Sequence, residues 1–291
     1  MAKAQWVRWK DGGGPRVIGS VGFNPAQPWG PWTKVLGVVA RCEGNHDTVV
    51  MYDGTGVTWG FLQWTFTSGR LQKLLESFKS IPLENGHHTL FDQVCLEAIG
   101  GPQVFSRFGF QIRDGKFWVG GVALDPSNSA SKKWIVDICM GVELANPNKT
   151  ALALAQLFAD MGAKPGVPEA QLAYAKAEFA RQLDYPRPPL GGRTIRDLLK
   201  ADNPASWDSA LVALFFNLWQ NNPGAAYKLF LKATSSSSDL VEDYFRKAWK
   251  MTNLSTFGQW GWKNDPKSPR CLRIAKAIKE FYGIALPFYK P

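Results

Sequence analysis

Two carboxylates lie ten residues apart in the segment RCEGNHDTVVMYDGTGVTWGFLQWTFTSG, residues 41–69. Glu43 follows an apolar run at 35–40, and apolar surroundings favour the neutral form of a carboxyl group. Asp53 lies in a polar, Gly-rich turn that favours the ionised form, and Thr58 follows with a hydroxyl able to hold a water. A neutral acid beside an ionised base is the pair that hydrolysis of a glycosidic bond requires. On spacing alone, however, a surface Glu at a helix end and a turn-forming Asp-Gly pair are the favoured interpretation.

The elements around this pair follow from hydrophobic periodicity. We expect a helix over about 33–44, a tight hairpin or three short strands over 52–62, and a second helix over about 68–78. Asp-Gly between alternating residues predicts another hairpin within 109–124. Further helices are expected at 91–99, 131–145, 150–162, 168–183, 194–201, 206–220, 223–234, 239–251 and 270–282. The fold class predicted is α+β, mainly helical, with a small β element near its start.

The N-terminal residues 1–30 are rich in Gly and Pro, which predicts an extended arm laid on the body of the protein. We expect residues 31–291 to form the catalytic domain, with helices inserted around 80–200. No run of about 18 apolar residues is present, so a membrane-spanning helix is not expected. The N-terminus lacks the apolar core of a secretory signal.

Charge and composition limit the classes of ligand and cofactor that the chain is expected to bind. The chain has 34 Lys and Arg against 24 Asp and Glu, a net charge of +10, which favours anionic partners. The basic residues are scattered and no nucleic-acid-binding motif is present, so nucleic acid is not expected as the ligand. The four cysteines are far apart without a CxxC pair, which argues against zinc, and we expect no metal or organic cofactor. Among 13 Trp, the candidates for stacking on sugar rings are Trp59, Trp64, Trp260 and Trp262, although core packing is the commoner role of any one Trp.

The residues around Glu43 resemble the catalytic core of the lysozyme superfamily, in which a helix ends at the catalytic Glu and a Gly-rich hairpin follows. An Asp of the animal-type enzymes is replaced here by Thr58, whereas the order Glu43, Asp53, Thr58 is similar to that of the phage-type lysozymes. The segment SWDSALVALFFNLWQNNPGAAYKLFLKA, residues 206–233, also resembles a helix pair of the phage enzymes, with Asn217 at their Asn.

This resemblance implies a lysozyme-like fold and a monomeric muramidase that cleaves the bacterial cell-wall glycan, peptidoglycan, with inversion. It implies Glu43 as general acid and Asp53 as base, assisted by Thr58. The substrate-binding residues expected with them are Trp59, Gln63, Trp64 and Asn217. Without a signal peptide, such an enzyme is made in the cytoplasm and acts at the cell wall after release or delivery.

Three alternatives remain open. Asp-Gly-Thr-Gly-Val-Thr-Trp-Gly at 53–60 also resembles a motif of the chitosanases, although these enzymes place the Glu further before the Asp, and their polycationic substrate suits a basic protein less well. A lytic transglycosylase needs only the Glu. A non-catalytic glycan-binding component of a phage particle or injection machine is the third.

Overall fold

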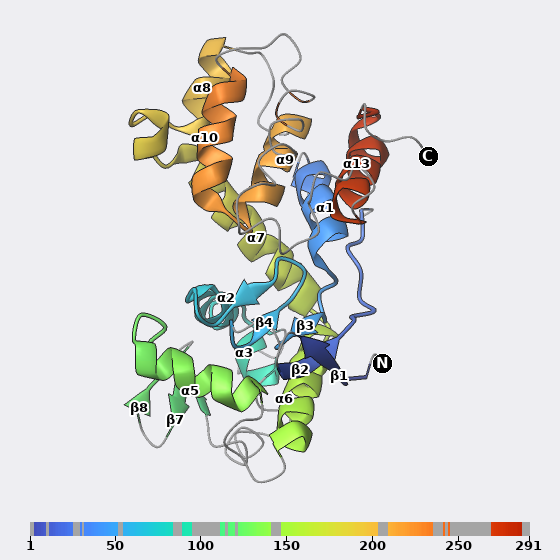
Figure 1. Ribbon diagram of the computed structural model, residues 1–291, viewed down its shortest axis with the longest axis vertical. Coiled ribbons are helices and arrows are strands. Elements are labelled where there is room, and N and C mark those ends of the chain that lie inside the picture. The colour runs from blue at the N-terminus through green and yellow to red at the C-terminus, as the bar shows by residue number, and fades with distance from the viewer. Residues whose placement is uncertain are drawn as a thin grey trace. The chain divides into compact units, whose positions relative to one another are not determined.

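The computed structural model describes residues 3–9, 12–25, 30, 32–51, 55–83, 89–94, 111–113, 116–119, 122–140, 147–202, 209–234, 241, 244 and 269–286 (Figure 1). It is mainly helical with small antiparallel sheets, which confirms the predicted α+β class. The chain divides into two compact units. Unit 1 comprises Met1–Phe23 and Gly44–Tyr174, and unit 2 comprises Asn24–Glu43 and Ala175–Pro291. The chain therefore passes from unit 2 into unit 1 directly after Glu43.

The sheet of unit 1 is antiparallel, with its strands in chain order. The strands are β1 Gln5–Trp9, β2 Gly12–Val17, β3 Val49–Val50, β4 Thr58–Trp59 and β5 Trp64–Thr65. The first two form a hairpin inside the segment that we expected to be an extended arm, and β2 then pairs with β3. The short strands expected over 52–62 are present, displaced by a few residues.

A second sheet of unit 1 contains β6 Gln111–Arg113, β7 Lys116–Val119 and β8 Val122–Ala123. The antiparallel pairing of β6 with β7 confirms the hairpin predicted within 109–124. The helices are α2 Arg70–Phe78, α3 Leu90–Asp92, α5 Ser129–Met140 and α6 Pro147–Gly162. Helix α2 buries Leu71, Leu74, Leu75 and Phe78, the one-sided pattern that its sequence predicted.

Unit 2 is helical where it is described. It contains α1 Trp32–Glu43, the 3-10 turn η2 Pro188–Leu190, α8 Ile195–Asp202, α9 Ala210–Trp219, α10 Pro223–Thr234 and α13 Pro269–Tyr282. The division between the units falls within α7 Val167–Asp184. Helix α9 is buried along its whole length and packs against α1 and α10, while α13 covers another side of α1. The helix expected at 239–251 lies outside the described residues, except for Val241 and Tyr244, which are helical.

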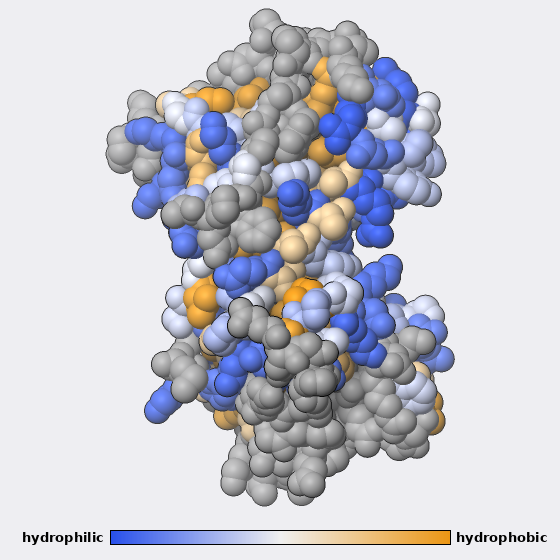
Figure 2. Space-filling view, turned by 180° about the vertical axis from the view of Figure 1, so that it is seen from behind, coloured by the Kyte–Doolittle hydropathy of each residue, from blue (hydrophilic) through white to orange (hydrophobic). Residues whose placement is uncertain are grey.

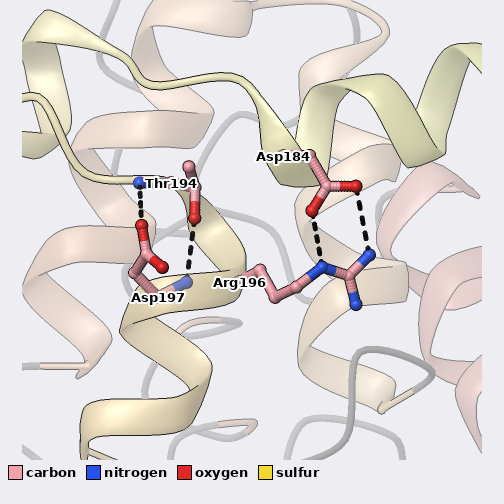
Figure 3. Close-up of polar contacts among 4 residues, drawn as sticks. All are labelled: Asp184, Thr194, Arg196 and Asp197. Carbon is pink, nitrogen blue, oxygen red and sulfur yellow. Dashed lines mark hydrogen bonds and ion pairs between the residues drawn. The ribbon is translucent and has the colours of Figure 1, made fainter.

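Polar contacts fix the start of α8 in unit 2 (Figure 3). Thr194 Oγ1 accepts a hydrogen bond from the backbone N–H of Asp197 at 2.9 Å, and the Asp197 carboxylate accepts from the Thr194 N–H at 3.0 Å. This reciprocal pair satisfies two donors at a helix start. Arg196 donates to both carboxylate oxygens of Asp184, at 2.5 and 3.3 Å, and so ties α8 to the end of α7.

Large apolar side chains are rarely exposed in the described part of the chain. Those that are exposed are Ile18, Val122, Tyr185 and Ile284. On the face shown in Figure 2, hydrophilic residues cover much of the described surface, with smaller apolar areas between them. None of the described helices combines the length and the apolar character needed to cross a membrane.

Candidate functional site

Glu43 is the last residue of α1, and its side chain is half-buried. The helix is held in unit 2 by a buried face that includes Val35, Val38, Val39 and Cys42. The Cys42 side chain is buried. Because the preceding turns are packed, the carboxyl group is presented from a well-anchored helix end.

The carboxyl group of Glu43 is held by an amide from the turn after α9. Asn221 Nδ2 donates to Glu43 Oε1 at 3.1 Å and to the backbone carbonyl of Asn217 at 3.4 Å. The turn is itself held in place, because Asn222 Oδ1 accepts from the Ala225 N–H at 3.0 Å and caps α10. With two acceptors for its two N–H groups, the Asn221 amide has a defined orientation.

Asn217 does not have the placement that we expected of a substrate-binding residue. Its side chain is only 2% exposed, and its Nδ2 has no hydrogen-bond partner in the described part of the chain. The backbone carbonyl of Asn217 instead supports Asn221, one helical turn further on. The asparagine that meets the carboxyl is therefore Asn221, which was not among the residues predicted from the sequence and lies in the turn after α9, four residues beyond Asn217.

Trp59 and Trp64 lie in the core of unit 1. Both are fully buried. The Trp59 ring lies 6.2 Å from Phe78 and 5.8 Å from Phe158, and Trp64 lies 5.4 Å from Phe61, all between ring centroids. Indoles covered in this way offer no face to a sugar, so their burial favours core packing over the expected stacking role. Trp260 and Trp262 lie outside the described residues.

Thr58 and Gln63 belong to the β4–β5 region of unit 1. The Thr58 side chain is 3% exposed, and its hydroxyl lies 2.7 Å from that of Thr55. Gln63 is half-buried with a left-handed backbone, φ 53°, and its Nε2 donates to the Gly60 carbonyl at 2.8 Å. Both side chains thus brace the loops on either side of β4. Asp53 lies outside the described residues.

The segment directly after Glu43 forms a buried corner in unit 1, residues 45–48. The Asp47 carboxylate accepts from the backbone N–H groups of Ser20 at 2.9 Å and Val21 at 2.8 Å. His46 Nδ1 lies 3.1 Å from Gln171 Oε1, while Gln171 Nε2 donates to the His46 carbonyl at 3.0 Å. Burial lowers the pKa of His46 below its usual 6.5. The local sequence carries no signal for this corner, because its partners lie 26 to 125 residues away in the chain.

In the described part of the chain, no three His, Cys, Asp or Glu side chains are grouped so that they could hold a metal ion. The chain matches no protein-family model, no curated protein and no solved structure. The arrangement around Glu43 therefore has to be interpreted from its own geometry: a half-buried carboxyl at a helix end, with one oxygen held by a neutral amide.

Proposed function

We propose that this protein is a lysozyme-like glycoside hydrolase, a muramidase that cleaves the peptidoglycan backbone with Glu43 as general acid. The observation that carries the proposal is the Glu43 carboxyl itself. It ends a packed helix, it is half-buried, and Asn221 holds one of its oxygens. Such a group can keep a defined position relative to a leaving oxygen while it gives up a proton.

The chain supplies a second carboxylate at Asp53. In this proposal Asp53 activates the attacking water on the opposite face of the sugar, which leads to inversion at the anomeric carbon. Thr58 assists Asp53 indirectly in this proposal. Its hydroxyl is hydrogen-bonded to that of Thr55, which lies two residues after Asp53 in the chain, and so helps to hold this loop. This reaction needs two carboxyl groups and neither a metal nor an organic cofactor.

The elements around Glu43 agree with the family resemblance. A helix ends at the acid, and the chain continues directly into a small antiparallel sheet. The net charge of +10 suits a polymer that carries carboxylates and phosphates, such as the bacterial cell wall. We propose that the enzyme works as a monomer at the wall, after release or delivery from the cytoplasm.

A cell-wall zymogram and a soluble turnover assay test the proposal with three variants. Glu43→Gln removes the acid and is expected to lower kcat by about 10²- to 10⁴-fold. Asp53→Asn should also lose turnover. Glu280→Gln is the matched control, because Glu280 is an exposed glutamate of unit 2 that pairs with Arg41 at 2.8 Å, and it should keep wild-type activity.

The products separate the related activities. New reducing ends of inverted configuration indicate the muramidase, whereas anhydro-sugar ends with an active Asp53→Asn indicate a lytic transglycosylase. Turnover of chitosan but not of cell wall indicates a chitosanase. Clearing by Glu43→Gln equal to that of wild type would overturn the assignment of the acid.

A further inference from the structure

Helix α9, which packs against α1, has no ionisable residue: Ala210–Trp219 reads ALVALFFNLW. The polar side chains of its last turn and of the turn that follows are all amides, at Asn217, Gln220, Asn221 and Asn222. The group that this part of unit 2 places on Glu43 is accordingly neutral.

A neutral partner suits a group that alternates between acid and carboxylate. A cation at hydrogen-bond distance favours the ionised form and works against proton donation. An amide N–H can donate to a carboxyl oxygen in either state. The contact of Asn221 Nδ2 with Oε1 can therefore persist while Glu43 gives up its proton.

We propose that Asn221 is a positioning residue that orients Glu43 through a neutral contact, one that the carboxyl group can keep in either protonation state. This inference rests on the proposed function, in which Glu43 is the acid. The second hydrogen bond of Asn221 Nδ2, to the Asn217 carbonyl at 3.4 Å, fixes the rotation of the amide and so directs its other N–H toward Glu43.

The described helices α1, α9 and α13 differ in the charged residues that they carry. Helix α1 carries Lys34 and Arg41, and α9 carries none. On α13 the exposed charged residues with described side chains are Arg273, Lys276, Lys279 and Glu280, and Arg41 is paired with Glu280. These groups stay unchanged when position 221 is altered, so Ala at this position removes the amide contact and Asp replaces the amide with a negative charge.

The decisive variant is Asn221→Asp, which keeps the shape of the side chain and replaces the donor with a carboxylate. We expect kcat to fall roughly 10- to 100-fold, because one hydrogen bond to the reacting group is lost. The alkaline limb of the pH–kcat profile should rise by about one pH unit, because a like charge disfavours ionisation of Glu43. Asn221→Ala should lower kcat with little change in KM and should also raise the limb.

Asn222→Asp is the matched control. It adds the same charge one residue further on, at the N-cap of α10, where Asp is as favourable as Asn. It should leave kcat close to wild type and shift the limb less than Asn221→Asp does. Equal effects of the two Asp variants would show a general charge effect and overturn the assignment of Asn221.

A readout without turnover separates this inference from the proposed function. The Glu43 side-chain carboxyl can be titrated by ¹³C NMR and assigned by its loss in Glu43→Gln. If wild type turns over no wall glycan, the proposed function fails, and a shifted titration in Asn221→Asp and Asn221→Ala still supports the contact. If wild type is active and both variants titrate and turn over as it does, the inference fails alone. Should Asn221→Asp not fold, Asn221→Ala decides in the same way.

Discussion

Gly162, the last residue of α6, allows the buried corner at 45–48 to approach the helix. A Cβ at this position would lie 2.6 Å from Asp47 Cα and 2.6 Å from the His46 carbonyl oxygen. Both atoms belong to the backbone, so no rotamer change relieves the overlap. The substitution Gly162→Ala therefore sets an overpacking cost against the usual gain of Ala over Gly in a helix.

The overpacking cost and the helix-propensity gain differ enough to predict the sign of the change in the free energy of unfolding. Overpacking costs about 1–3 kcal/mol or more, and replacing Gly by Ala within a helix returns at most about 1 kcal/mol. We expect Gly162→Ala to lower the free energy of unfolding by about 1–2 kcal/mol, measured by urea denaturation with far-UV circular dichroism and Trp fluorescence.

Gly224→Ala is the matched control in α10. The nearest atom to a Cβ there is Asn222 Oδ1 at 3.9 Å, so the same substitution meets open space. It should stabilise the protein by roughly 0.5–1 kcal/mol. If Gly162→Ala stabilised the protein as much as Gly224→Ala, the close approach of α6 to the corner would be refuted.

Further predictions concern the polar contacts of the two units. Asp47→Ala leaves the N–H groups of Ser20 and Val21 without their acceptor and should cost about 2–3 kcal/mol of unfolding free energy; a cost under about 0.5 kcal/mol would contradict this role. Because burial lowers the pKa of His46, its neutral form stabilises unit 1 fully above pH 6.5, the pKa in the unfolded chain. The free energy of unfolding should fall as the pH drops below this value, by at most about 1.4 kcal/mol per pH unit, and urea titrations of His46→Asn should lack this slope. The exposed Asp184–Arg196 pair should show a coupling below about 1 kcal/mol in a double-mutant cycle, reduced further in salt, and a larger coupling would mean that the surroundings exclude water.

Much of the secondary structure could be predicted because it depends on local periodicity. Helices α1, α2, α6, α7 and α10 begin and end within a few residues of their predicted bounds. The β1–β2 hairpin was missed, since the strand Gly12–Val17 begins with three glycines and contains Pro15. Such a strand is held by backbone pairing with Gln5–Trp9, which leaves no alternation of side chains in its sequence.

The roles of the tryptophans depended on distant partners. Trp59 lies on a two-residue strand, and its neighbours Phe78 and Phe158 come from α2 and α6. Whether an indole on a sheet is covered or open is decided by the helices that pack on that face, which a local motif does not specify. The same holds for the 45–48 corner, whose partner Gln171 is 125 residues away from His46.

The shift from Asn217 to Asn221 shows which part of a site a motif can predict. Asn217 lies in the last turn of α9, whereas Asn221 lies in the turn two residues after the helix ends. The motif therefore predicts which end of α9 lies near Glu43, and the packing of α9 in unit 2 decides which asparagine meets the carboxyl. Buried apolar side chains hold α9 in place, including Phe216, which stacks on Phe179 of α7 with the ring centroids 3.9 Å apart. Repacking this contact with Phe216→Leu should thus disturb the Asn221–Glu43 bond from a distance, and it should move the alkaline limb of activity in the same direction as Asn221→Ala.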